Sequence, residues 1–478
     1  MIYPRKREFL KISKYFNLIP VYKEIGADTE TPVSVFLKTC SGPYSFLFES
    51  AKFNERWGRY SFISNDPLSV FLGKRRKIFS EYGRDFSFKG DYIDGIRRII
   101  KSFKVYWQND FPSASGGCFG YVAYDIIKDW EPVGNKNVLS STIPLIYFII
   151  PRTIIVFDHL LNKMKIISWV RNDEKDYEDG IRRIGEIEKS LVRGVYEKEE
   201  KIDTKITGTN FKKNVFERIV RRAKSYIING DIVQVVLSRR IEGKTERDPF
   251  NIYRSLRYIN PSPYMFYMKF KDLYLIGSSP EILVRKEKDN AIVRPIAGTR
   301  RRGRNEDEDR KLERELLNDE KEIAEHIMLV DLGRNDIGKV CIPGTVEVYD
   351  KMVIERYSHV MHIVSGVRGK LKRGEDSFSL FKATFPAGTV TGAPKVRAMQ
   401  IIEELENTAR GIYSGSVGYF SFNGDMDMAI TIRTIYMKGK RFYVQAGAGI
   451  VYDSIPEREF YETENKAKAL VKAIGSEQ

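Results

Sequence analysis

The feature that most constrains the fold is a series of short apolar segments, separated by glycine and proline, in the first 195 residues. FLFES, GRYSFI, GCFGYVAYD and LIYFIIPRTIIVF are rich in aromatic and β-branched residues, a composition typical of strands. The longest of them, Thr142–Phe157, is interrupted by Pro144 and Pro151. It is therefore too broken to cross a bilayer and is interpreted as two buried strands.

Helical periodicity is confined to a few segments. Strands outnumber these segments and do not alternate with them in βαβ units, so we predict an α+β fold. Strands are also expected at Val233–Ser238, Met265–Phe270, Leu273–Ile276, Ser416–Phe422 and Ala429–Tyr436. The expected helices are Asp91–Phe103, Glu178–Val192, a segment capped by Thr209 or Asn210 and ended by Gly230, Lys321–Leu332, Pro394–Leu405 and Pro456–Ala473.

A charged stretch divides the chain near its middle. Glu197–Lys201 and the following Asp203–Asn210 lack apolar periodicity and are interpreted as a linker. We therefore expect an N-terminal region, 1–200, and a C-terminal region, 201–478.

Composition excludes some classes of protein and leaves others open. The three cysteines are far apart in sequence, which indicates a reducing, cytoplasmic location without a disulfide framework. The N-terminus has no apolar core typical of an export signal. The net charge of +16 is spread along the chain, so it fits an anionic substrate or an acidic partner, with nucleic-acid binding as an alternative.

Acidic residues three apart occur on two of the expected helices. Glu322 and Glu325 lie on one, and Glu459 and Glu462 on the other, so each pair shares a helix face. Mg²⁺ prefers carboxylates combined with water and an anionic substrate. Two solvated helix faces would give the same spacing, so both interpretations stay open.

Three glycine-rich segments are interpreted as loops: Pro295–Thr299, Phe385–Lys395 and Gln445–Gly449. Glycine permits close backbone approach, so the N–H groups of such loops can bind carboxylates. Pro394 fits the first turn of the helix after the second loop, which predicts an anion site at that N-terminus. Simple turns are the alternative.

Two of the four histidines lie in the expected strand SHVMHIVSGV. The spacing of His359 and His362 places them on opposite faces of a strand. One can therefore enter a site while the other packs or meets solvent, and a structural histidine is the alternative.

Eight motifs in a fixed order resemble those of the chorismate-utilising enzyme family. Between Phe211 and Ala473 the chain contains PIAGTR, EHIMLVDLGRND, SHVMHIVSG, FPAGTVTGAPK, GIYSGSVGYF, TIRT, QAGAGIV and E-x-x-N-K-A. Leu47–Ser50, Gly58–Ser61 and Gly116–Asp125 are similar to the family's anthranilate synthase branch. The resemblance implies large antiparallel sheets packed together with helices on the outside, and two regions that share one intertwined core.

The resemblance also assigns metal and substrate positions. Glu325 and Glu462 would hold Mg²⁺ against the ring carboxylate of chorismate, with Glu322 and Glu459 as nearby or water-mediated ligands. An arginine and a glycine-rich segment suit the second carboxylate, on the enolpyruvyl group. The implied substrate positions are Gly298, Thr299 and Thr389 along the ring, and Tyr413, Arg433, Gly447, Ala448, Gly449 and Lys466 around the enolpyruvyl carboxylate.

Two further residues resemble the family's proton-handling groups. Glu281, in Ser-Ser-Pro-Glu, would protonate the leaving 4-hydroxyl. It must be protonated to do so, which the adjacent apolar Ile282–Val284 favours. His362 resembles the histidine that assists the later loss of pyruvate.

Members of the family differ in what attacks the ring. Enzymes that add water carry a lysine base where this chain has Gln234, and glutamine cannot take a proton from water. Aminodeoxychorismate synthases commonly carry a nucleophilic lysine where this chain has Ala297. The pair predicts direct attack by ammonia beside the ring carboxylate, through an aminodeoxyisochorismate intermediate. Aminodeoxychorismate synthase stays the alternative, because some members lack that lysine.

The ammonia source is predicted to be a separate glutaminase subunit. Gly117–Gly120 resembles an amidotransferase nucleophile elbow around Cys118 only superficially, since no Cys–His arrangement accompanies it. Free ammonium should substitute for the partner.

Feedback inhibition by tryptophan is a further implication of the resemblance. The segment around Glu49 and Ser50, together with Pro263, Tyr264 and Met265, resembles the tryptophan site of anthranilate synthases. Phe48 stands where that motif usually has leucine. A buried strand packed on a proline-rich turn is the alternative.

Two other classes stay as alternatives. A binding module that has lost catalysis would have lost acidic or arginine positions, yet Glu281, Glu325, Arg433 and Glu462 are present. A nucleic-acid binder would have a steeply salt-dependent affinity.

Overall fold

A computed structural model describes residues 1–50, 58–140, 142–194, 203–357 and 360–475. Its helices are α1 (Lys6–Ile12), α2 (Pro32–Thr39), α3 (Tyr92–Lys101), α4 (Glu174–Leu191), α5 (Lys213–Ile228), α6 (Pro249–Ile259), α7 (Glu306–Leu317), α8 (Glu320–Gly338), α9 (Ser377–Thr384), α10 (Lys395–Leu405) and α11 (Pro456–Ile474). Its strands are β1 (Ile2–Tyr3), β2 (Leu18–Gly26), β3 (Tyr44–Glu49), β4 (Tyr60–Lys74), β5 (Lys77–Gly83), β6 (Ser87–Lys89), β7 (Gly117–Val122), β8 (Ile146–Asp158), β9 (Lys163–Arg171), β10 (Thr204–Thr209), β11 (Gln234–Thr245), β12 (Tyr264–Phe270), β13 (Leu273–Ser279), β14 (Ile282–Glu287), β15 (Asn290–Val293), β16 (Ile296–Arg301), β17 (Glu347–Arg356), β18 (Val360–Lys370), β19 (Gly392–Ala393), β20 (Ser416–Ser421), β21 (Met426–Ile430), β22 (Thr434–Lys438) and β23 (Arg441–Ile450).

The strands form one hydrogen-bonded network that divides into two antiparallel sheets at β4 and β8. β4 and β8 are long enough to belong to both sheets. At one end of this pair, the first sheet continues through β3, β12, β13, β22, β23 and β11. At the other end, the second sheet continues through β7, β20, β21, β14, β15 and β18. The register is irregular where Pro67 faces Pro151, because proline cannot donate to the ladder. The two prolines therefore lie where the paired strands pass from one sheet to the other.

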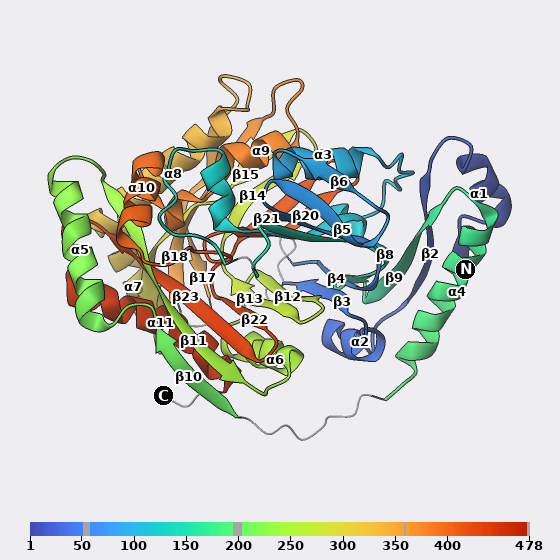
Figure 1. Ribbon diagram of the computed structural model, residues 1–478, viewed down its shortest axis with the longest axis horizontal. Coiled ribbons are helices and arrows are strands. Elements are labelled where there is room, and N and C mark those ends of the chain that lie inside the picture. Colours follow the sequence, from blue (N-terminus) through green and yellow to red (C-terminus); the bar gives the residue numbers. More distant parts are fainter. Residues whose placement is uncertain (51–57, 141, 195–202, 358–359, 476–478) are drawn as a thin grey trace.

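Both halves of the sequence contribute to each sheet. β3 pairs with β12 and β7 pairs with β20, and the blue and teal strands meet the yellow and red ones in the middle of the molecule (Figure 1). Aromatic side chains cross the same boundary, with the rings of Phe148 and Phe420 6.1 Å apart. The predicted α+β fold with outer helices is confirmed. The expected division at residues 200 and 201 lies outside the described residues.

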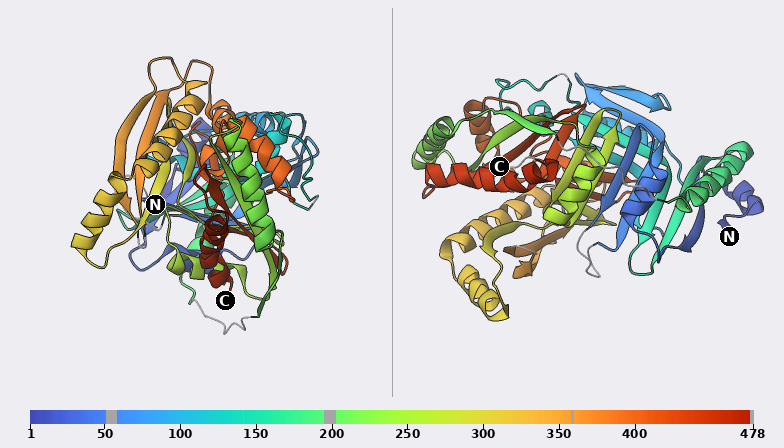
Figure 2. Two further views of the ribbon diagram at one scale, coloured as in Figure 1. Left: turned by 90° about the vertical axis from the view of Figure 1, so that its left-hand side faces the viewer. Right: turned by 90° about the horizontal axis from the view of Figure 1, so that it is seen from below.

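Two helices flank the same end of the sheets. α8 packs against β16 and β18, and α11 packs against β23 and α5. Viewed from below, α7–α8 and α11–α5 project as two separate arms (Figure 2, right). Their positions matter because α8 and α11 carry the predicted acidic pairs.

Most expected helices are present close to their predicted bounds, but their ends differ. α5 buries Phe216, Val220 and Ala223 as its periodicity requires, and Gly230 follows it at φ +80°. Its N-cap is Lys212, without a side-chain cap, so the predicted caps Thr209 and Asn210 are wrong. α8 extends six residues beyond the predicted Leu332.

Several strand predictions need correction. Thr142–Phe157 contains one strand, β8, rather than two, although the sheet changes near its Pro151. Asp203–Asn210 contains β10, paired with β11, rather than a linker, and Glu197–Lys201 lies outside the described residues. Ala429–Tyr436 divides into β21 and β22. Arg433 between them has φ +50°, a conformation that interrupts a strand.

Two of the three predicted glycine loops are strands. Pro295–Thr299 largely forms β16 and Gln445–Gly449 lies within β23, because both segments pair with long neighbours, β18 and β11. The third, around Gly388, contains a short 3-10 turn, η3 (Gly388–Val390). Among the helices described, none has the length and apolarity needed to span a membrane.

Candidate active site

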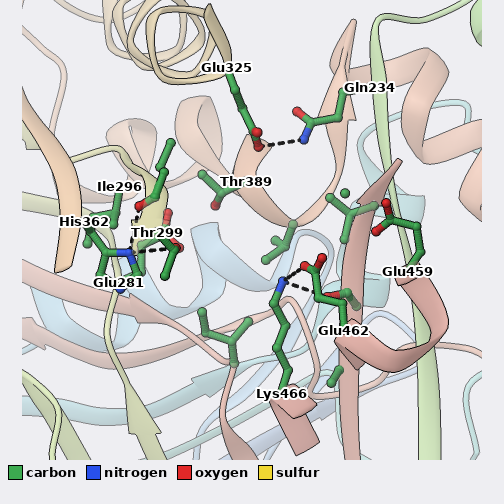
Figure 3. A pocket seen from close by; sticks show the side chains of 18 of the residues that line it. Gln234, Glu281, Ile296, Thr299, Glu325, His362, Thr389, Glu459, Glu462 and Lys466 are labelled. Atoms are coloured by element: carbon green, nitrogen blue, oxygen red, sulfur yellow. Dashed lines mark hydrogen bonds and ion pairs between the residues drawn. The ribbon is translucent and has the colours of Figure 1, made fainter. Parts of the chain in front are cut away.

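A cavity of about 840 Å³ is lined by strands of both sheets and by α8 and α11 (Figure 3). Its lining joins motifs that lie more than 200 residues apart in sequence. Of the residues predicted for the metal, the substrate and the proton transfers, the cavity brings together Gln234, Glu281, Gly298, Thr299, Glu322, Glu325, His362, Thr389, Tyr413, Arg433, Gly447, Gly449, Glu459, Glu462 and Lys466.

Carboxylates face this cavity from two helices. Glu325 Oε1 accepts a hydrogen bond from Gln234 Nε2 at 3.1 Å, and Glu462 Oε1 lies 2.6 Å from Lys466 Nζ. Burial raises the pKa of Glu325, and the nearby carboxylates of Glu322 and Glu462 raise it further. Burial also raises the pKa of Glu459, with Glu462 adding to the effect. The negative charges of these four glutamates are therefore only partly balanced by nearby cations.

This donor set fits Mg²⁺. In the described part of the chain, no three acidic, histidine or cysteine side chains are close enough to enclose a metal on their own. Mg²⁺ does not require such a cage, because it commonly binds one or two carboxylates together with water and substrate oxygens. Carboxylates whose pKa values are raised by one another gain from a cation placed between them.

Glu281 differs from the helical glutamates because it lies between two strands and is almost fully buried. It lies between β13 and β14 and is 8% exposed. Burial raises its pKa to about 7, although the Thr389 hydroxyl and the Lys466 ammonium oppose the shift. A carboxyl group with this pKa is substantially protonated near neutrality and can donate a proton.

His362 lines the same cavity as Glu281 and Thr299 (Figure 3). Its Nδ1 is 3.0 Å from both Thr299 Oγ1 and the Gly298 carbonyl oxygen. A bulge in β16 between Ala297 and Thr299 allows this contact, and Gly298 adopts φ +63° there. The strand prediction for His362 is confirmed, whereas its neighbour His359 lies outside the described residues.

The glycines of β23 allow two other side chains of the cavity to approach the strand closely. A Cβ atom on Gly447 would lie 2.5 Å from the Tyr413 hydroxyl, and one on Gly449 would lie 2.7 Å from Gln234 Nε2. Lys466 Nζ donates to the Gly447 carbonyl at 3.1 Å. Arg433 Nη1 donates to the Lys466 carbonyl at 2.5 Å, and burial lowers the arginine's pKa. These contacts hold two cations beside a stretch of bare backbone.

Two predictions do not fit the cavity. Ala448 does not line it: its side chain is fully buried in the core with Leu237 and Phe216, because alternate residues of a strand face opposite sides. The anion site expected at the α10 N-terminus lies outside this cavity and stays a prediction. There, Lys395 forms a buried ion pair with Asp336 and also donates to the Thr384 carbonyl.

Gln234 carries an unused acceptor. Its side chain is 4% exposed, and its Oε1 has no hydrogen-bond partner among the described residues, while its Nε2 is held by Glu325. Buried amide oxygens are rarely left unpaired. The oxygen is thus available to an N–H donor that enters the cavity.

Sequence reasoning missed several lining residues. Lys321, Ser454, Arg458 and Asn465 also face the cavity. They lie within four residues of the predicted glutamates on α8 and α11 or in the turn before α11, so helical spacing was the signal that could have found them.

A second cavity, of about 400 Å³, contains the residues predicted for tryptophan. Met265 of β12 pairs directly with Glu49 of β3. The Glu49 carboxylate accepts a 2.5 Å hydrogen bond from the Tyr253 hydroxyl and forms an ion pair with Arg257 at 2.8 Å. Burial raises the pKa of Glu49. The predicted residues that line this cavity are Glu49, Ser50, Pro263, Tyr264 and Met265.

Aromatic side chains form much of the apolar surface of this second cavity. Phe48, Tyr60, Phe62, Phe266 and Tyr419 all contribute to its wall. Charged residues also line it: Glu49, Arg59, Arg285, Lys286, Glu287, Asp425 and Asp427. Among them, Asp427 accepts a hydrogen bond from the Tyr264 hydroxyl at 3.0 Å and pairs with Arg285 at 2.6 Å. The cavity is suited to a flat apolar group with a polar end.

Comparison with known proteins gives consistent matches over nearly the whole chain. Residues 45–472 match the family described as chorismate binding enzyme. Anthranilate synthase component 1 of Aquifex aeolicus is 52% identical over 98% of this chain and 97% of its own, and that of Acetivibrio thermocellus is 46% identical over 99% of both. The crystal structure of anthranilate synthase component I from Streptococcus pneumoniae has a TM-score of 0.78 at 38% identity, covering 86% of this chain and 92% of the other. The Escherichia coli isochorismate synthase MenF has the same fold, with a TM-score of 0.74 at 18% identity over 98% of both chains.

Proposed function

Because this chain belongs to the chorismate binding enzyme family and is an enzyme of the anthranilate synthase component 1 type, we propose that its charged cavity aminates chorismate with ammonia and releases anthranilate and pyruvate. The observation that carries the proposal is the grouping of acidic, cationic and proton-donating side chains in one cavity. This is the first committed step from chorismate towards tryptophan.

The two substrate carboxylates are placed by opposite charges. Lys466 and Arg433, beside the bare backbone of Gly447, bind the enolpyruvyl carboxylate. The ring carboxylate lies towards Glu325 and Glu462, which would hold Mg²⁺. When bound, that ion neutralises the carboxylate and offsets its repulsion from the surrounding glutamates.

Amination then needs a nucleophile and an acid. The side-chain carbonyl oxygen of Gln234 accepts a hydrogen bond from ammonia and so orients the ammonia molecule. The nitrogen bonds to the ring carbon next to the carboxylate, both ring double bonds shift by one position, and the C4–O bond breaks. The added nitrogen, which now carries one proton too many, releases that proton to solvent. Glu281 gives its proton to the departing hydroxyl, which leaves as water. The aminodeoxyisochorismate intermediate results.

Loss of pyruvate completes the reaction. His362, held by Thr299 and Gly298, assists transfer of the proton from the aminated carbon to the enolpyruvyl methylene. The bond between the ring carbon and the enolpyruvyl oxygen breaks, pyruvate leaves with that oxygen, and the ring becomes aromatic.

Ammonia is supplied by a separate glutaminase component. The component 1 relatives imply a partner component by their names. Cys118 offers no nucleophile of its own, because it is fully buried in β7 and burial raises its pKa well above the usual value. Free ammonium therefore replaces the partner, and glutamine alone does not.

The second cavity is proposed to bind tryptophan as a feedback inhibitor. Its aromatic wall suits an indole ring, and Ser50 lies where the amino-acid end would be bound. Tyr264, in its wall, pairs across β12 and β13 with Ser279, two residues before Glu281. Ligand binding at one cavity thus has a short route to the acid in the other.

The test is to identify the products made by the purified chain alone. With chorismate, Mg²⁺ and ammonium at alkaline pH, we expect anthranilate, followed by its fluorescence, and an equal amount of pyruvate, while glutamine is inert. The second candidate is aminodeoxychorismate synthase. A 4-amino product that keeps the enolpyruvyl group would favour it and would mean that Ala297 does not discriminate between the two reactions.

A further inference from the structure

Two cationic side chains line the charged cavity without a part in the proposed reaction. Lys321 lies in the first turn of α8 and Arg458 in the first turn of α11. Both are exposed, so they lie where the cavity meets solvent, and they come from the two helices that bear its acidic pairs.

Neither head group is engaged by the protein. Within the described ranges, neither side chain makes a hydrogen bond or a salt bridge. Lys321 acts only at longer range, where its charge lowers the pKa of Glu459. Lys466, deeper in the cavity, is instead held by Glu462 and the Gly447 carbonyl. The outer cations are free to meet an incoming anion.

The cavity lining has more acidic residues than lysines and arginines. Five glutamates, Glu281, Glu322, Glu325, Glu459 and Glu462, face a cavity that must admit a substrate with two carboxylates. Four cations oppose them: Lys321, Arg433, Arg458 and Lys466. Arg300 also pairs with Glu322 at 3.1 Å. Without the outer two cations, the glutamates would still outnumber the positive charges around the cavity, so an approaching dianion would be repelled.

We propose that Lys321 and Arg458 form a cationic entrance that captures the dianionic substrate and guides it past the glutamates. The inference rests on the proposed function, since it takes the substrate to be chorismate. Both side chains also lie at helix N-termini, where the backbone adds positive potential. Because they are exposed, their attraction acts on the rate of encounter and is screened by salt over about 10 Å at 0.1 M.

The experiment compares charge variants at several ionic strengths. Chorismate consumption is followed with saturating ammonium and Mg²⁺ for the wild type, Lys321→Gln/Arg458→Gln and Lys321→Glu/Arg458→Glu. The matched control is Lys11→Gln/Arg441→Gln, which removes the same charge from exposed residues that do not line the cavity. Following consumption keeps the test independent of which amino product forms.

At low salt we expect kcat/KM to fall about 5-fold in the glutamine variant and about 30-fold in the glutamate variant, within the range of electrostatic steering. We expect kcat to change less than about two-fold, and the three values of kcat/KM to converge in about 0.5 M salt as screening grows. The control should follow the wild type.

Two results would overturn the proposal. One is a salt dependence of kcat/KM in the cavity variants equal to that of the wild type. The other is a loss that persists undiminished at high salt, which indicates a structural defect or direct contact in the bound state. A wild type that consumes no chorismate would instead refute the proposed function.

Discussion

The two cavities differ in how their charged groups are compensated, although strands of the same network support both. The larger one has five glutamates and four cations facing an open space of about 840 Å³. The smaller one, of about 400 Å³, has six aromatic residues in its wall, and its charged groups include two close ion pairs, Arg285 with Asp427 and Glu49 with Arg257. Charges that are only partly compensated can hold a metal and move a proton, whereas an aromatic wall with paired charges is suited to binding. The difference separates the proposed catalytic cavity from the proposed regulatory one.

The hairpin of β12 and β13 lies between these functions. Tyr264 belongs to the aromatic cavity, and its partner Ser279 leads directly to Glu281. If tryptophan binds the smaller cavity as proposed, this strand pair is the short connection between its site and Glu281. Substitutions in one cavity should leave the function of the other unchanged.

Glu325→Gln should abolish Mg²⁺-dependent turnover. The change removes one of the two carboxylates proposed to hold the ion while leaving a side chain of the same size next to Gln234. Anthranilate formation is measured against Mg²⁺ concentration. Glu320→Gln, an exposed change on the same helix, is the control. Full activity in Glu325→Gln would remove this residue from the metal site.

Glu281→Gln should lower the amination rate about 1,000-fold, equivalent to about 4 kcal/mol of transition-state stabilisation. The amide cannot donate the proton that the leaving hydroxyl requires. Single-turnover chorismate consumption gives the rate, and chorismate binding should stay within a few-fold of the wild type. A kcat close to the wild-type value would contradict the role of general acid.

His362→Met should slow the loss of pyruvate about 100-fold while amination continues. The aminated intermediate then accumulates, because only the second step depends on the ring nitrogen held by Thr299. Quenched samples are separated by chromatography. Normal anthranilate output without the intermediate would exclude His362 from the mechanism.

Ser50→Leu should weaken tryptophan inhibition about 10-fold, or about 1.4 kcal/mol. The larger apolar side chain enters the aromatic cavity and removes a hydroxyl that faces the ligand's polar end. Inhibition is titrated in the ammonium-dependent reaction. Unchanged inhibition would place the tryptophan site elsewhere, with the charged cavity unaffected.

The sequence predicted helices and motif residues well where local pattern decides the structure. α11 and the buried face of α5 follow from periodicity alone. Fifteen of the predicted site residues line one cavity. Ala448 was the exception, because it lies in the middle of a strand and its side chain faces the core.

The remaining errors arose where distant partners decide the structure. β16 and β23 contain several glycines, which suggested loops, but pairing with β18 and β11 stabilises them as strands. The turn at Arg433 was hidden because nothing in Ala429–Tyr436 signals a positive φ. Lys321 and Arg458 lie one helical turn from Glu325 and Glu462, but only the folded chain shows that the two helices bring them to one cavity.

The pH dependence of kcat/KM for chorismate tests most directly whether the charged cavity works through a protonated Glu281. This parameter reports the free enzyme, and free ammonia is held constant at each pH. Because burial raises the Glu281 pKa to about 7, its acid form is lost as pH rises through that value. We predict a descending limb with its midpoint near pH 7, falling tenfold for each pH unit above it. A value that stays level or rises with pH would contradict the account.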